Sequence, residues 1–250
     1  MTDATAAEPE TVSFGYEEVT PEEKTERVGA VFSSVAKNYD RMNDAMSAGM
    51  HRLWKDRFVH RVKPRSGEAI IDMAGGTGDI AFRMARHGAA ITVSDINQDM
   101  LDVGIERAEK QGIQGLTWSR QNAEELTFGD RAFNAYTIAF GIRNVTRIDK
   151  ALAEAHRVLK PGGRFFVLEF STTEWPGFAE AYDFYSHRIV PQLGQMIAGD
   201  SESYRYLIES IRRFPKMREF EGMIRSAGFR HTKVEPILGG AVAIHSGWKV

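Results

Sequence analysis

The chain has 250 residues, 42% of them hydrophobic and 26% charged, which is an ordinary composition for a soluble globular protein. With 32 Lys and Arg against 34 Asp and Glu, the net charge is −2, so we expect no nucleic-acid partner. The chain has no cysteine, which excludes disulfides, thiolate metal sites and a cysteine nucleophile. It shows neither a signal-peptide pattern nor an apolar run of about 18 residues, so we expect a cytoplasmic protein.

The N-terminal quarter predicts an acidic tail followed by helices. Residues 1–23 contain seven Asp and Glu and no Lys or Arg, which is typical of a mobile tail. Residues 24–65 show helical spacing of apolar side chains. Within them, HRLWKDRFVHRVKPR from His51 carries six Lys and Arg against one Asp. Such a helix either packs on the domain with its charges solvated or docks on an anionic membrane surface.

Strands and helices alternate over residues 66–170. Short apolar runs that begin at residues 69, 90, 116, 133 and 163 predict strands, and helical patterns over 79–88, 100–112 and 147–160 separate them. This alternation predicts an α/β fold with a doubly wound, mostly parallel sheet. We expect helices over 171–215, and a last helix with two strands over 216–250. All of these belong to one predicted domain, 1–250.

The most informative motif, IDMAGGTGD, lies between the first predicted strand and the first helix of this alternation. Gly75, Gly76 and Gly78 allow the backbone to approach a ligand closely. Asp95 ends the second strand, 17 residues after Gly78, where a carboxylate can accept hydrogen bonds from both hydroxyls of a ribose. The motif therefore predicts a nucleoside or nucleotide ligand.

Two ligand classes fit these glycines. Residues 76–81 spell G-x-G-x-x-A, the fingerprint of dinucleotide-binding oxidoreductases that use NAD. However, Asp72 and Asp79 flank the turn, and acids there repel a pyrophosphate but suit the ammonium group of S-adenosylmethionine. Asn122 closes the third strand, where its amide can face an adenine edge.

The motif order resembles that of class I S-adenosylmethionine-dependent methyltransferases. More narrowly, the chain resembles the ubiquinone/menaquinone biosynthesis C-methyltransferase family, in the stretches VAKNYDRMND, HRLWK, FGIRNVT, SYRYL and GGAVAIHSGWKV. The resemblance implies a seven-stranded Rossmann-like sheet whose last strand is antiparallel. It also implies S-adenosyl-L-methionine as the cofactor and contacts to it from Thr77, Asp95, Asn122 and Ala123. The family usually has Ser where this chain has Ala139, so a hydroxyl contact is missing there or the backbone supplies it. The full set of predicted cofactor-binding residues is Asp72, Gly75, Gly76, Thr77, Gly78, Asp95, Asn122, Ala123 and Ala139.

The family's reaction is methylation of a ring carbon on a polyprenylated hydroquinone. The implied substrates are 2-polyprenyl-6-methoxy-1,4-benzoquinol, for ubiquinone, and demethylmenaquinol, for menaquinone. Alternatives are another small-molecule methyltransferase with a sterol or phenol substrate, an NAD-dependent oxidoreductase, and a non-catalytic methyltransferase-like subunit. The seven His residues are scattered without a metal-ligand spacing, so we expect no metal.

Four residues are candidates for the chemistry. Arg143 and Asn144 follow the fourth strand, where Arg143 could stabilise a developing phenolate and Asn144 could orient a ring hydroxyl; the alternative is a loop anchored by the two. Tyr39 and Asp40 are candidate proton acceptors, with packing and helix-terminal roles as the alternative. His51 is either a proton relay or a structural histidine.

A polyprenyl tail needs an apolar channel, and aromatic residues are frequent before the last predicted helix. The candidates for this lid or channel, with ordinary core packing as the alternative, are Trp175, Phe178, Tyr182, Phe184, Tyr185, Tyr204 and Tyr206. A substrate dissolved in the bilayer predicts peripheral contact with the inner leaflet through the basic helix. Other quinone-biosynthesis enzymes and a second copy of the chain, forming a homodimer, are further partner hypotheses.

Overall fold

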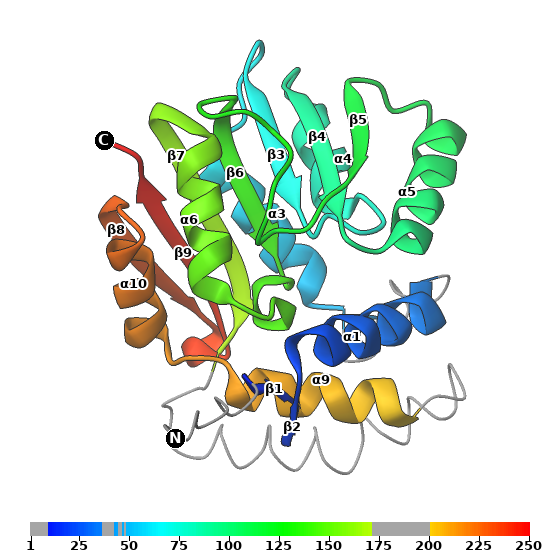
Figure 1. Cartoon of the computed structure of the whole chain (residues 1–250). Coiled ribbons are helices and arrows are strands. Elements are labelled where there is room, and N and C mark those ends of the chain that lie inside the picture. The colour runs from blue at the N-terminus through cyan, green and yellow to red at the C-terminus, as the bar shows by residue number, and fades with distance from the viewer. Residues whose placement is uncertain (1–9, 37–42, 45–46, 48, 172–200) are drawn as a thin grey trace, which may run out of the picture.

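The computed structural model describes residues 10–36, 43, 44, 47, 49–171 and 201–250. Within them, seven strands form one sheet in the order β5-β4-β3-β6-β7-β9-β8 (Figure 1). β9 pairs antiparallel with β7 and β8, and the pairs among β3 to β7 are parallel. The predicted doubly wound α/β fold with an antiparallel last strand is therefore confirmed. The strands are β3 (Ala69–Met73), β4 (Ala90–Asp95), β5 (Leu116–Arg120), β6 (Phe133–Ala139), β7 (Leu159–Phe170), β8 (Arg230–Ile237) and β9 (Val242–Trp248).

Helices cover both faces of the sheet, because alternate strand residues point to opposite sides. In β3, Ile70 packs into one hydrophobic cluster and Ile71 into the other. The first cluster includes residues of α3 (His51–Val62), α4 (Asp79–Ala85) and α5 (Gln98–Gln111). The second includes residues of α6 (Ile148–Val158) and α10 (Met217–Ser226), which lie on the opposite face (Figure 1). Two cores, each closed by helices, thus hold the sheet rigid.

The junction between α6 and β7 differs from the prediction. We expected a helix through Lys160, but α6 ends at Val158 and β7 begins at Leu159. Leu159 is fully buried and pairs with Phe133 of β6. Its packing beside β6 therefore outweighs the helical pattern of the preceding residues.

The expected mobile tail over residues 1–23 is wrong for its second half. Residues 12–19 form an antiparallel hairpin of β1 (Val12–Phe14) and β2 (Glu17–Val19), and α1 (Pro21–Val35) follows directly. At least three of the seven acids that suggested a solvated tail have cationic partners beyond residue 23. The pairs are Glu10 with Arg147, Glu17 with Arg27 and Glu18 with Arg213.

Two helices cross the end of the sheet at which the parallel strands finish (Figure 1). One is α1 and the other is α9 (Ser201–Arg213). They are joined through the hairpin, because Phe14 of β1 stacks on Tyr206 of α9 with ring centroids 4.3 Å apart. The short helices η2 (Ile142–Asn144) and η4 (Leu238–Gly240) follow β6 and β8. In the described residues, no helix combines the length and apolar character needed to cross a bilayer.

Candidate active site

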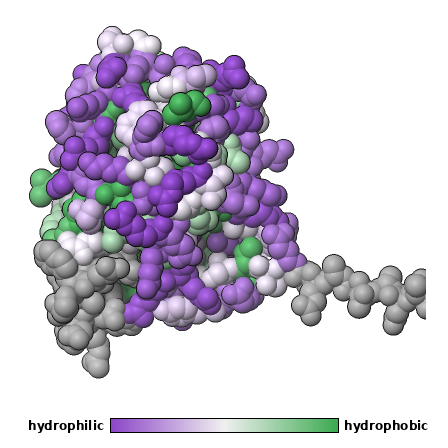
Figure 2. All heavy atoms as spheres, turned by 90° about the vertical axis from the view of Figure 1, so that its left-hand side faces the viewer, coloured by the Kyte–Doolittle hydropathy of each residue, from purple (hydrophilic) through white to green (hydrophobic). Residues whose placement is uncertain are grey.

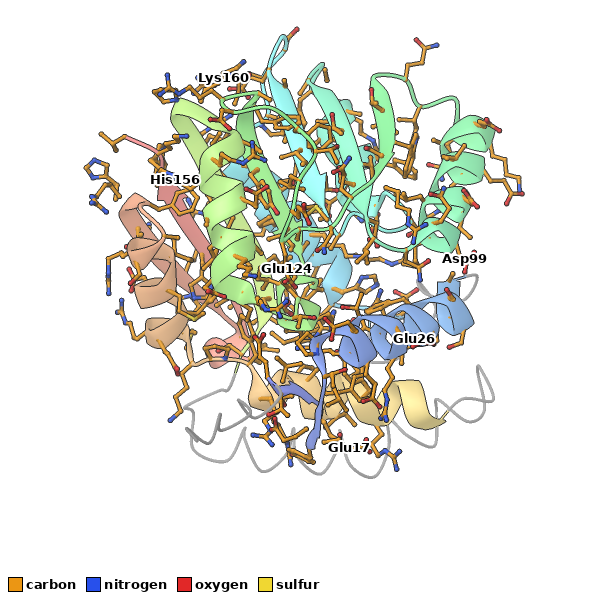
Figure 3. All side chains as sticks on the ribbon, viewed as in Figure 1. Glu17, Glu26, Asp99, Glu124, His156 and Lys160 are labelled. Carbon is orange, nitrogen blue, oxygen red and sulfur yellow. The ribbon has the colours of Figure 1, made fainter. Side chains whose placement is uncertain are left out.

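A cavity lies at the carboxyl ends of β3, β4 and β6, on the side closed by α1. Its wall contains every predicted cofactor-binding residue except Gly78. Four residues of α1 face it, namely Thr25, Val28, Gly29 and Phe32. In an open α/β sheet this edge is the usual place for a ligand. Figure 3 shows Glu124, another wall residue, between α6 and α1, whereas Lys160 and His156 lie toward the opposite end of α6.

Two glycines after β3 bring bare backbone to the cavity wall. A Cβ on Gly75 would lie 2.9 Å from the carbonyl oxygen of Asp72, and one on Gly76 would lie 2.8 Å from Cε of Met100. Gly76 also has a φ of +50°, which disfavours larger residues. The predicted close approach of backbone to ligand is therefore possible at these two positions.

Gly78 has a different place. It precedes α4 with a φ of 83°, and a Cβ there would lie 2.8 Å from the Trp118 ring. Gly78 is absent from the cavity wall, so the structure does not support a direct ligand contact. Its requirement for glycine comes from the left-handed backbone and from packing against β5 and α4.

Asp95 is held with both carboxylate oxygens fixed by backbone donors. The N–H of Gly76 donates to Oδ2 at 3.0 Å, and the N–H of Asn97 donates to Oδ1 at 2.9 Å. Burial raises the pKa of Asp95 to about 6, against the lowering effect of these hydrogen bonds. A carboxylate has about four lone-pair sites, so it can still accept a hydrogen bond from a ribose hydroxyl after these backbone contacts.

Asp72 lines the cavity, and one of its carboxylate oxygens is buried without a hydrogen-bond partner among the described residues. Its side chain is buried, and Thr137 donates to Oδ1 at 2.8 Å, while Oδ2 has no partner among the described residues. Burial raises the pKa of Asp72 to about 7, partly offset by the Thr137 hydrogen bond. A buried carboxylate oxygen without a donor is costly, and a ligand cation at the wall would satisfy it.

Beyond β5, residues 122–124 form another part of the wall. Asn122 accepts the N–H of Glu124 through Oδ1 at 3.0 Å, which fixes the turn. Glu124 in turn accepts the backbone N–H groups of Thr146 and Arg147 at 3.0 and 3.1 Å. Asn122 and Ala123 thus line the same cavity as Asp95.

The predicted catalytic residues divide into three groups. Asn144 lines the cavity, and its Oδ1 accepts a hydrogen bond from the Tyr206 hydroxyl at 3.1 Å. Arg143 is not part of the wall, because its guanidinium is buried against Glu169 and the Phe140 carbonyl at 2.8 and 2.6 Å. This placement fits the alternative of a loop anchor better than direct contact between Arg143 and a substrate oxygen. Tyr39 and Asp40 lie outside the described residues, as do Trp175, Phe178, Tyr182, Phe184 and Tyr185, and nothing is described for the side chain of Tyr204.

His51 is also absent from the cavity wall. Its Nε2 lies 2.8 Å from Oδ1 of Asp44, and its side chain is buried. Burial lowers the pKa of His51, with the Asp44 contact opposing that shift. This geometry fits the structural alternative for His51 better than a proton relay at the cavity.

Sequence reasoning missed Lys55 as a residue of the site. Lys55 is buried, lines the cavity and lies with Nζ 2.8 Å from Oδ2 of Asp79. The charge pattern alone places it among the solvated charges of the basic helix. Its spacing from His51 and Val59, four residues in each direction, places it on the buried face and was the available signal.

The parallel sheet, the glycine turn and the acid after the second strand together define a Rossmann-like nucleoside-binding protein. Solved structures share this fold. They include a methyltransferase from Thermotoga maritima described as a possible histamine N-methyltransferase (TM-score 0.63, 20% identity, 88% of this chain and 99% of that one). The [4+2]-cyclase SpnF is similar too (TM-score 0.65, 19% identity, 90% and 96% covered).

Sequence relatives narrow the class. The profile of the ubiE/COQ5 methyltransferase family matches residues 20–249, and the chain belongs to this family. A Zymomonas mobilis protein named ubiquinone/menaquinone biosynthesis C-methyltransferase UbiE is 62% identical, covering 96% of this chain and all of that protein. A protein of the same name from Bradyrhizobium sp. is 53% identical, with 96% and 98% covered. The chain is therefore an S-adenosylmethionine-dependent methyltransferase, and the NAD-dependent alternative is excluded.

Proposed function

We propose that the protein methylates a ring carbon of a polyprenylated hydroquinone in ubiquinone or menaquinone biosynthesis. The expected acceptors are 2-polyprenyl-6-methoxy-1,4-benzoquinol and demethylmenaquinol. The observation that carries this proposal is the 62% identity to the Zymomonas mobilis protein over almost the whole chain. The similarity covers 96% of this chain, so it favours quinone substrates over sterols and other phenols.

The cavity wall offers groups that match each part of S-adenosylmethionine, whose sulfonium supplies an electrophilic methyl group. Asp95 would accept the ribose hydroxyls, and Asn122 with Ala123 would border the adenine. The backbone at Gly75 and Gly76 leaves room for close approach, and Asp72 would receive the ammonium group through its unpartnered Oδ2. Thr77 and Ala139 also line the cavity, and both side chains are uncharged.

The acceptor ring requires alignment with the donor methyl group and removal of a phenol proton. Asn144 is suited to orient a ring hydroxyl, because Tyr206 already fixes its Oδ1 and leaves its NH₂ group available as a donor. Arg143 serves this arrangement indirectly: its ion pair with Glu169 anchors η2, which carries Asn144. Tyr39 and Asp40 stay predictions for the proton acceptor.

Peripheral membrane contact through α3 is the second part of the proposal. Leu53 on α3 is 70% exposed, as an inserting side chain would be. The available positive charge is smaller than the sequence suggests, because Arg52 pairs with Asp44, and Arg57 and Arg61 share Glu235. The face with α10 and β8 is covered mostly by hydrophilic residues (Figure 2). Contacts with other quinone-biosynthesis enzymes and with a second copy stay predictions.

The membrane contact can be tested by sedimentation with vesicles. The protein should bind vesicles that contain anionic lipid, bind less as salt increases, and bind less still after Leu53→Asp. Asp substituted for another exposed residue far from α3, such as Tyr16, is the matched control. Equal binding to neutral vesicles at all salt concentrations would count against docking through α3.

The substrate assignment can be tested by deleting the gene from its host and measuring the quinones. The deletion strain should accumulate unmethylated precursors with the prenyl tail attached. A plasmid with the wild-type gene should restore the quinones, and an Asp95→Ala version should not. Normal quinone content in the deletion strain would contradict the proposal.

A further inference from the structure

The charged residues of the cavity wall are acids, with one exception. Among the described residues that line it, Lys55 is the only Lys or Arg, whereas the acids are Asp72, Asp79, Asp95 and Glu124. A cation with so many acidic neighbours is readily held in place. It also gives the wall one position at which a ligand anion would be favoured.

The environment of Lys55 shows that the structure fixes its ammonium group. The residue is 5% exposed and comes from α3, whose neighbouring residues Trp54 and Phe58 pack in the core. Its Nζ lies 2.8 Å from Oδ2 of Asp79, and Nε of Arg83 lies 3.4 Å from the other oxygen. Burial opposes ionisation of Asp79, but the charges of Lys55 and the nearby arginines keep the pKa of Asp79 below its usual value. The charged form of Asp79 is thus favoured beside Lys55, at the cavity wall.

The ammonium group of Lys55 has N–H donors available for a ligand. A lysine carries three N–H bonds, and within the described part of the chain Asp79 is the one acceptor bonded to Nζ. Asp79, by contrast, has a cation close to each of its oxygens. Our sequence interpretation gave Asp79 the role of favouring the ligand's ammonium group. The structure favours Asp72 for that contact, because Asp72 lines the cavity and its Oδ2 has no partner among the described residues.

We propose that Lys55 binds the carboxylate of the methionine end of S-adenosylmethionine, and that Asp79 positions its Nζ for this contact. The methionine end carries one ammonium and one carboxylate. Asp72 and Lys55 supply one group of opposite charge for each. The inference rests on the proposed placement of the cofactor in this cavity. It gives the HRLWK stretch a ligand-binding role in addition to its place in a packed helix.

Calorimetry with two ligands isolates this contact. S-Adenosylhomocysteine has the complete amino-acid end, and S-adenosyl-3-thiopropylamine is the same molecule without the carboxylate. Lys55→Met removes the charge and keeps an unbranched side chain of similar length. Affinity for S-adenosylhomocysteine should fall about 10- to 100-fold, because a charge-assisted hydrogen bond is lost. Affinity for the decarboxylated ligand should change less than about 3-fold, which is within the normal context dependence of such contacts.

A second variant guards against loss of folding. Lys55→Met leaves the partly buried Asp79 without its nearest cation, which is destabilising in itself. The double variant Lys55→Met with Asp79→Asn removes both charges and should show the same ligand selectivity. Equal losses for both ligands in a folded variant, or no loss for S-adenosylhomocysteine, would overturn the role of Lys55. If the wild-type protein bound neither ligand, the proposed cofactor site itself would be wrong.

Discussion

Arg143 and Glu169 form a buried ion pair, with Nη1 and Oε1 2.8 Å apart and side chains only 3% and 0% exposed. The register of β6 and β7 places Ala139 opposite Leu168, and Phe140 donates its N–H to the Leu168 carbonyl. The η2 turn that follows then lies beside Glu169, the next residue of β7. Glu169 also accepts the N–H of Phe170 at 2.9 Å. The pair ties η2, and with it Asn144, to the end of the central sheet.

The first prediction concerns this pair and stability. Arg143→Met should lower the free energy of unfolding by about 3–5 kcal/mol, because it leaves Glu169 buried without its cation. The double variant Arg143→Met with Glu169→Leu should regain most of that loss. Urea unfolding of both variants measures the difference. A single variant as stable as the wild type would contradict the buried pair.

The same residue offers a test of its catalytic role. Arg143→Lys retains a cation beside Glu169, so a residue that only positions η2 should keep most of its turnover. A residue that stabilises the substrate oxyanion directly should lose about 10²–10³ in turnover in Arg143→Lys and Arg143→Met alike. Single-turnover rates with saturating cofactor distinguish the two. We expect the first result, and the second would restore the role inferred from sequence.

Asp95 provides a prediction that depends on pH. At pH 8, Asp95→Asn should weaken binding of S-adenosylhomocysteine at least about tenfold, because an ionised acceptor of two hydroxyls is replaced by an amide. The pKa of Asp95 is about 6, so the wild-type carboxyl becomes protonated below that pH. The difference between the two proteins should therefore shrink between pH 7 and 5. Titration calorimetry over this range would show a constant difference if Asp95 did not contact the ligand.

We expect that replacing the buried Asp72 with Asn stabilises the folded protein, although Asp72 lines the proposed cofactor site. The pKa of Asp72 is about 7 in the folded protein, above its ordinary value of 3.8, so folding favours the protonated form. The wild type should consequently lose stability as the pH rises toward and through 7, whereas Asp72→Asn should not. Without cofactor, the variant should gain up to about 4 kcal/mol over the wild type between pH 4 and 8. Urea unfolding at several pH values checks this, and parallel curves for both proteins would argue against the buried carboxyl.

Tyr206 links α9 to the cavity through Asn144. Tyr206→Phe removes the hydroxyl that donates to Asn144 Oδ1 and keeps the ring stacked on Phe14. Cofactor affinity should stay within about 3-fold of wild type, while turnover falls by roughly tenfold, the effect of one lost hydrogen bond. Assays quenched at fixed times with saturating cofactor measure turnover. Loss of cofactor affinity with unchanged turnover would mean that Tyr206 acts on the cofactor and not, through Asn144, on the acceptor ring.

Local patterns sufficed to predict much of the fold and the nucleotide wall. The β-branched runs predicted the strands of the parallel sheet, and the glycine turn with Asp95 predicted one side of the cavity, because these features depend on residues close in sequence. The hairpin at residues 12–19 was missed because its acids are paired with Arg27 and Arg213, which composition does not reveal.

The direction of Arg143 and the burial of Lys55 were missed for a related reason. Each depends on an ion-pair partner that lies 24 or 26 residues away and is brought near by the sheet and helix packing. A charge pattern along one helix or loop does not contain that partner. A residue such as Lys55 is recognised as buried only when the apolar face of the helix is identified first and its charged residues are then compared with that face.

The central claim is carbon methylation of a prenylated hydroquinone, and methyl transfer from S-adenosylmethionine with a ¹³C-labelled methyl group tests it most directly. The purified protein should be incubated with reduced demethylmenaquinol and, separately, with 2-polyprenyl-6-methoxy-1,4-benzoquinol in detergent. The account predicts a product whose labelled methyl gives the carbon-13 shift of a methyl on an aromatic ring carbon, formed by the wild type and lost in Asp95→Ala. A label on oxygen, or no transfer to either acceptor by protein that binds the cofactor, would contradict it.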